Sequence, residues 1–109
     1  MKLLINERDA SPIQYEQFTF TELLNKDNGC INCSAGVLEY IQDEFIQGSV
    51  HEDQEGFYVL QGQGYAKVGD VEFPISPGSC FIVLPGHYHS IKKDLSVPCI
   101  KLFYFHAAV

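Results

Sequence analysis

The sequence predicts an all-β sandwich or barrel, and three observations support this fold class. Short apolar segments rich in Val, Ile, Phe and Tyr follow one another from about residue 37 onward. Gly, Pro, Asp and Asn separate them at intervals of roughly ten residues, which is typical of all-β domains. The 109 residues are 46% hydrophobic and 19% charged, so we expect one buried core and no second one.

Six segments have the length and composition of β-strands. They cover residues 37–46, 57–61, 64–68, 71–75, 80–84 and 97–105. Gly69-Asp70 leaves a two-residue loop between two of them, and glycine there can adopt a positive φ, so this pair is predicted to form a hairpin. Sharp turns are expected at Pro77-Gly78 and Pro85-Gly86.

The region before the strands is predicted to be a short N-terminal extension, about 1–30, of a single domain that spans 1–109, with a barrel over about 31–106. Thr19 and Glu22 have the spacing of a helix capping box, which predicts one short helix. Phe18 and Phe20 alternate with polar residues, which would instead favour a strand.

The charge and the apolar pattern exclude several classes of partner. Fourteen Asp and Glu against seven Lys and Arg give a net charge of −7, which disfavours binding to nucleic acid or to an anionic membrane surface. There is no apolar stretch of the ~20 residues needed to cross a bilayer, and the N-terminus turns polar too early for a signal peptide. We therefore expect a cytoplasmic protein.

The four cysteines are expected to be free thiols, with Cys80 and Cys99 buried in the core. Cys30 and Cys33 form a lone CxxC pair. A structural zinc site would need two further ligands at matching spacing, and a redox role would need a thioredoxin-like βαβ unit. Neither accompanies the pair, so no role is assigned to it.

Histidines and carboxylates gather beside two of the predicted turns. His51 and Glu55 would be about 13 Å apart on one extended strand, so the chain must turn between them if both bind one ion. A hairpin loop over 52–54 would set the two opposite each other, with Ser49 on the same face. His89 follows the Pro85-Gly86 corner. Two imidazoles and one carboxylate suit a divalent transition metal with open positions for substrate or water.

These two stretches resemble the two sequence motifs of the cupin superfamily. The first motif, HxH followed by E and then G, is matched by His51, Glu55 and Gly62. The second, G followed by PxG and then H, is matched by Gly78, by Gly86 of Leu84-Pro85-Gly86, and by His89. The resemblance covers roughly 37–105 and implies a double-stranded β-helix, or jelly-roll, barrel.

The sequence departs from the family pattern at four points, one of which is the absence of the motif glycine before His51. Ser49 stands at the first histidine of HxH, Leu84 at the motif proline, and Lys93 where asparagine is usual. The resemblance therefore implies a metal set of His51, Glu55 and His89. Glu55 would act as ligand or catalytic base, and the ion would be iron, manganese, nickel, zinc or copper.

Further residues are predicted around this site. Ser49, Asp53 and His87 are candidates for the substrate pocket, and Asp53 and His87 are also possible substitute ligands. The position of His87 beside the Pro-Gly corner favours a solvent-exposed loop residue. Tyr58, Phe81 and Phe103 are predicted to line the pocket mouth. His106 is predicted to be structural. The strand around Phe103-Tyr104-Phe105 is apolar on both faces, which indicates a second subunit and agrees with the homodimers usual among small cupins.

Two functions follow from the resemblance. The first is a metal-dependent enzyme that acts on a small polar metabolite such as a sugar derivative or an oxoacid. The alternative is a metal-free ligand-binding or sensor module that holds a small effector in its barrel. A purely structural or storage role is disfavoured, because burying His51, Glu55 and His89 costs free energy that only a binding or catalytic role would justify.

Overall fold

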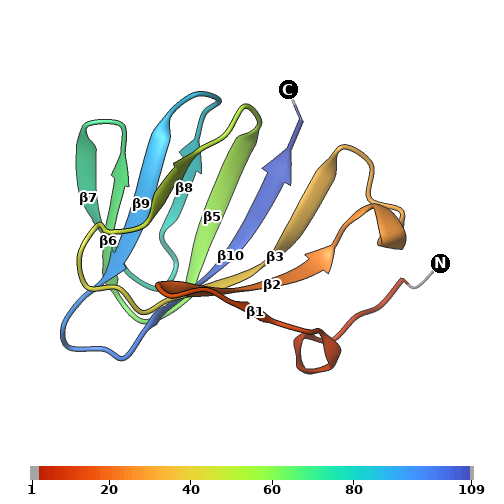
Figure 1. Cartoon of the computed structure of the whole chain (residues 1–109), viewed down its shortest axis with the longest axis horizontal. Coiled ribbons are helices and arrows are strands. Elements are labelled where there is room, and N and C mark those ends of the chain that lie inside the picture. Colours follow the sequence, from red (N-terminus) through yellow and green to blue (C-terminus); the bar gives the residue numbers. More distant parts are fainter. Residues whose placement is uncertain (1–2, 109) are drawn as a thin grey trace.

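The computed structural model of the chain describes residues 3–108, and its ordered elements there are strands and two single 3-10 turns (Figure 1). The strands form two antiparallel sheets, which confirms the all-β prediction. The larger sheet has the order β1-β2-β3-β10-β5-β8 and the smaller one β4-β9-β6-β7. The elements are η1 (Glu7–Asp9), β1 (Ile13–Gln14), β2 (Phe18–Leu24), η2 (Lys26–Asn28), β3 (Cys33–Tyr40), β4 (Gly48–Val50), β5 (Gln54–Gln61), β6 (Gly64–Val68), β7 (Val71–Ile75), β8 (Cys80–Val83), β9 (Tyr88–Lys93) and β10 (Ile100–Ala107).

The core lies between the two sheets and is built by the two-residue alternation of strand side chains. On β10, Ile100, Leu102 and Tyr104 are buried in the core. Phe103 and Phe105 on the opposite face of the same strand are each 37% exposed. The expectation that both faces of this strand are apolar is therefore met, with one face in the core and the other at the surface.

The predicted hairpin and turns are present. β6 and β7 pair up to Val68 and Val71, and Gly69 between them has a φ of 58°. Gly78 and Gly86 also have positive φ, 94° and 80°. Glycine adopts these angles without the steric cost that a Cβ atom would bring, so these positions turn the chain where the sequence indicated.

The prediction of a short helix around Thr19 and Glu22 is wrong, because residues 18–24 form strand β2. β2 pairs with β3 from Phe18 opposite Tyr40 to Glu22 opposite Gly36. The alternation of aromatic residues places Phe18 and Phe20 against the core. Burial of these rings outweighs the local capping signal, so the predicted extension contributes two strands to the larger sheet.

The expectation that Cys80 and Cys99 are buried is also wrong. Cys80 is exposed and Cys99 half-buried. Cys80 begins β8, which is an edge strand, and it lies opposite the exposed Tyr58. All four cysteines are free. Among residues 3–108 there is no helix long and apolar enough to cross a membrane.

Gly36 is predicted to be essential for the close approach of β2, β3 and β10. A Cβ atom at this position would collide with the carbonyl oxygen of Thr21 and lie 2.8 Å from the hydroxyl of Tyr104. We expect Gly36→Ala to lower the free energy of unfolding by about 1–3 kcal/mol, measured by thermal or denaturant unfolding. Gly69→Asn is the control, because its surroundings are open and asparagine tolerates positive φ. Equal stability of the two variants would contradict this account.

Candidate metal centre

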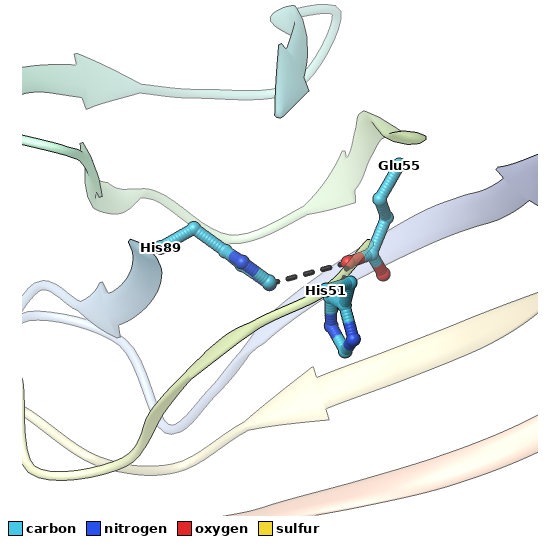
Figure 2. A group of neighbouring side chains, drawn as sticks. All are labelled: His51, Glu55 and His89. Carbon is cyan, nitrogen blue, oxygen red and sulfur yellow. Dashed lines mark ion pairs between the residues drawn. The ribbon is translucent and has the colours of Figure 1, made fainter. Parts of the chain in front are cut away.

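Three side chains from separate parts of the chain converge between the two sheets (Figure 2). The Nε2 atom of His89 lies 3.2 Å from Oε1 of Glu55, and Nε2 of His51 lies 3.4 Å from the same oxygen. One potential ligand atom from each residue lies within 4.8 Å of the other two. The two imidazoles and the carboxylate thus surround a common point.

The strand arrangement explains how these residues meet. Glu55 lies on β5 of the larger sheet, and His89 lies on β9 of the smaller sheet, opposite Ser49 of β4. His51 directly follows β4. The predicted hairpin between His51 and Glu55 is wrong, because β4 and β5 belong to different sheets. The chain does turn between the two residues, but it crosses from one sheet to the other.

The burial of this group is suited to a bound cation. Glu55 and His89 are each only 3% exposed. Oε1 of Glu55 and Nδ1 of His89 have no hydrogen-bond partner among the described residues, so the close contacts of Oε1 are not aligned as hydrogen bonds. A buried carboxylate oxygen without a partner is costly, and a cation at the common point would satisfy it. The donor set of two nitrogens and one oxygen fits a divalent transition metal.

Ser49 occupies the place of the first motif histidine. Its Oγ lies 3.2 Å from Nε2 of His51, at hydrogen-bonding distance. A neutral hydroxyl is a weak metal ligand, so the site offers three strong ligands rather than four. The remaining coordination positions would be open to water or to a substrate.

His106 belongs to the site, although the sequence predicted a structural role. Its Nε2 lies 3.0 Å from Oε2 of Glu55, and its Nδ1 lies 3.1 Å from Oδ2 of Asp53. The signal that would have found it is strand alternation, because His106 is two residues beyond the inward-facing Tyr104 on β10. Asp53 therefore contacts the site through His106.

The electrostatics of the metal-free site follow from these contacts. The hydrogen bond to Glu55 raises the pKa of His106 above its ordinary value, against the effect of burial. Burial alone would raise the pKa of Glu55, but the contacts with His106 and His89 hold it below its usual range. Burial lowers the pKa of His51, and the nearby carboxylate of Glu55 only partly opposes this. The carboxylate is thus charged and His51 is neutral near pH 7, as metal binding requires.

The site opens into a cavity of about 210 Å³ with an apolar wall and a polar wall. The polar wall holds the ligand candidates together with Ser49 and His106. The apolar wall comes from β2 and the segment before it, and also from β3 and β10. The lining residues are Tyr15, Phe18, Phe20, Leu38, Tyr40, Ser49, His51, Glu55, His89, Tyr104 and His106.

The aromatic residues expected at the pocket mouth lie elsewhere. Tyr58 and Phe103 are opposite each other on the outer face of the larger sheet, 47% and 37% exposed. Phe81 packs against the core and stacks on Phe57, with ring centroids 4.8 Å apart. Strand alternation turns the first two away from the barrel interior. His87 is exposed in the turn before β9, so its ring also lies outside the cavity lining.

Residues 37–103 match the family described as Cupin domain. The chain belongs to the cupin family. The residues of this cupin that carry both motifs, from His51 to His89, lie inside the matched region.

The curated relatives that match this cupin are named acireductone dioxygenase. The relative from Leishmania major is 35% identical over 75 residues, which is 64% of this chain and 22% of the relative. The relative from Saccharomyces cerevisiae is 28% identical over 112 residues, which is 94% of this chain and 62% of the relative. This cupin therefore spans about a fifth of the length of the Leishmania protein.

Solved structures with the same fold include the cupin domain of Cnp3 from Schizosaccharomyces pombe. It is 25% identical, has a TM-score of 0.76, and aligns with 94% of this chain and 71% of its own. A protein described as a predicted oxalate decarboxylase from Thermotoga maritima has a TM-score of 0.83 at 14% identity, over 97% of this chain and 99% of its own. These likenesses agree with the jelly-roll barrel.

The His106–Glu55 pair predicts a pH-dependent stability of the metal-free protein. The raised pKa of His106 means that its contribution is complete below about pH 6.5, its usual value, and is lost as pH rises through the folded-state pKa. The lowered pKa of Glu55 means that its contribution is lost as pH falls through its own folded-state pKa. We expect the stability difference between the wild type and His106→Gln to be largest near pH 5–6.5 and to shrink at higher pH.

Denaturant unfolding across pH in the presence of a chelator measures this difference. His87→Gln is the matched control, because His87 is exposed in a turn. A difference between wild type and His106→Gln that did not vary with pH would contradict the assigned charge of the pair.

Proposed function

We propose that this cupin binds one divalent transition metal ion through His51, Glu55 and His89 and is a metal-dependent enzyme. The observation that carries this proposal is the convergence of the three potential ligands on one wall of a cavity. The unsatisfied oxygen of Glu55 supports it, because Oε1 is buried and has no hydrogen-bond partner in the described part of the chain.

The chemistry of such a site can be described from the chain's own side chains. A bound ion supplies Lewis-acid polarisation and open coordination positions for oxygen ligands. Oε1 of Glu55 would hold the ion, while Oε2 lies 3.0 Å from Nε2 of His106. The hydroxyl of Ser49, beside His51, can donate a hydrogen bond to a substrate in the cavity. The aromatic side chains of the lining would contact an apolar part of the substrate.

The substrate we propose first is an acireductone, with the protein acting as a dioxygenase. The curated relatives carry this name, and the similarity to the Saccharomyces relative extends over 94% of this chain. The mixed lining of the cavity supports a small molecule with oxygen ligands at one end and an apolar part at the other. Because the chain spans only part of these relatives, the activity stands as a proposal.

The substrates predicted from the sequence, a sugar derivative or an oxoacid, are the other candidates for this enzyme. The described residues that line the cavity include no Lys or Arg. An anionic oxoacid would therefore depend on the metal ion for charge compensation. A neutral sugar derivative would find polar partners in Ser49, in the histidines and in the tyrosine hydroxyl groups of the lining.

A metal-free binding module is the second candidate function. The specific observation that favours it is Ser49, which replaces one nitrogen ligand by a hydroxyl at hydrogen-bonding distance from His51. In that case the histidines and Glu55 would bind a polar effector directly, and the aromatic wall would hold its apolar part.

We also propose a homodimer formed through the outer face of the larger sheet, and a cytoplasmic location. Phe103, Phe105, Tyr58 and Ile82 are exposed on that face and lie on the adjacent strands β10, β5 and β8. A contiguous apolar surface of this kind is typical of protein interfaces. The four free thiols are consistent with a reducing compartment.

The metal-binding proposal predicts a stoichiometric transition metal. We expect about one ion per chain by elemental analysis of protein purified without added metal, and reversible binding by calorimetry after chelation. His89→Ala should abolish stoichiometric binding, because it removes one of three nitrogen and oxygen ligands. His87→Ala should bind like the wild type. If protein purified without a chelator were metal-free and also failed to take up any of iron, manganese, nickel, zinc or copper, the binding-module function would replace this one.

The dioxygenase proposal predicts oxygen consumption by the metal-loaded protein. With an acireductone under air we expect substrate loss and oxygen uptake, measured by absorbance and with an oxygen electrode. The His51→Ala variant should show neither substrate loss nor oxygen uptake, since it lacks a metal ligand. The His87→Ala variant should show both. If metal-loaded protein did not raise the rate of acireductone loss above the uncatalysed rate, the dioxygenase proposal would be wrong. Sugar derivatives and oxoacids would then be the substrates to test.

A further inference from the structure

Three side chains form a continuous chain of contacts behind the proposed metal ligands. Oδ2 of Asp53 lies 3.1 Å from Nδ1 of His106, and Nε2 of His106 lies 3.0 Å from Oε2 of Glu55. The other oxygen of Glu55, Oε1, faces His51 and His89. The two oxygens of this carboxylate therefore have different neighbours.

The backbone fixes this arrangement. His106 lies directly opposite Glu55 in the pairing of β10 with β5, and Asp53 immediately precedes β5. β10 pairs with β3 on its other side, so the strand that carries His106 is held on both edges. The imidazole consequently has little freedom to leave the carboxylate.

Both nitrogens of His106 are engaged by carboxylates. A metal ligand needs one nitrogen that is free to face the ion, and in His106 each nitrogen already lies within 3.1 Å of a carboxylate oxygen. His106 is also outside the group of ligand atoms that converge within 4.8 Å. Its place is next to the ligand Glu55 and not next to the ion. Partners in this position orient a metal ligand, and they influence the affinity for the ion without touching it.

We propose that His106, oriented by Asp53, is a positioning residue that occupies Oε2 of Glu55 and leaves only Oε1 for the metal ion. This inference rests on the metal binding proposed above. With Glu55 held to one oxygen and Ser49 in place of a histidine, the protein supplies three ligand atoms. An ion that takes more than three ligands would then keep positions open for a substrate or water.

Cobalt(II) is a suitable probe, because its visible absorption reports the coordination number and its binding can be titrated. The variants are His106→Leu, which removes the imidazole, and His106→Gln, whose amide N–H can donate to Oε2 in its place. We expect His106→Leu to weaken cobalt binding about 10–100-fold and to change the intensity of the cobalt absorption, because Glu55 can then bind through both oxygens. His106→Gln should recover most of the affinity and the wild-type spectrum.

X-ray absorption of the cobalt protein separates a positioning residue from a ligand. We expect two imidazoles around cobalt in the wild type and still two in His106→Leu. A third imidazole in the wild type that disappears in His106→Leu would overturn the proposal by making His106 a ligand. Far-ultraviolet circular dichroism and the melting temperature of each variant check that the barrel is folded.

Asp53→Asn tests the outer end of the chain of contacts. Asparagine keeps the size of the side chain but removes the charge that orients the imidazole of His106. We expect it to weaken cobalt binding in the same direction as His106→Leu and by a smaller factor. His87→Gln, at an exposed histidine, should leave affinity and spectrum unchanged.

The outcomes distinguish this inference from the proposed function. Wild-type protein that does not bind cobalt or any other divalent transition metal would refute both. Wild-type protein that binds cobalt, with His106→Leu matching it in affinity and spectrum, would refute the positioning role and leave the metal site intact. A loss of affinity in both His106→Leu and His106→Gln with unchanged spectra would also refute it, since it would indicate a general packing effect.

Discussion

The buried carboxylate of Glu55 is the group on which the arrangement of the site depends. An isolated charge at 3% exposure would be strongly destabilising, so its environment must compensate it. The imidazoles of His106 on β10 and His89 on β9 do so, and they keep its pKa below the usual range despite its burial. These groups come from both sheets. The same charge that makes the site suitable for a cation therefore links the two halves of the barrel.

Much of the site could be predicted from the sequence, because local rules determine it. The glycines at the turns mark positions of positive φ, and His51, Glu55 and His89 have the spacing of the cupin motifs. Their convergence was expected and is present. The expected hairpin was wrong because sequence spacing requires a turn between His51 and Glu55 but does not specify whether the chain stays within one sheet or crosses to the other.

Other parts of the structure depend on long-range packing and could not be predicted from local sequence patterns. Strand β9 was not among the predicted strands, because Tyr88–Lys93 is mostly polar, yet His89, Ser90 and Ile91 are all buried. Ser90 is buried because its hydroxyl bonds to the backbone carbonyl of Gln47. The sequence of β2 has the capping-box spacing of a helix start, but the packing of its aromatic rings against the core favours a strand. His106, near the end of the described chain, gained its role only through pairing with Glu55, about fifty residues away.

The division of the cavity into two walls has an evolutionary consequence. The groups that can hold an ion come from residues 49–106, whereas the rings of Tyr15, Phe18 and Phe20 come from the first strands of the chain. Changes in that early segment can reshape the space offered to a reactant while the ion-holding side chains stay as they are. Part of the apolar lining is thus encoded apart from the ion-holding residues, so that selection could alter that part without rebuilding them.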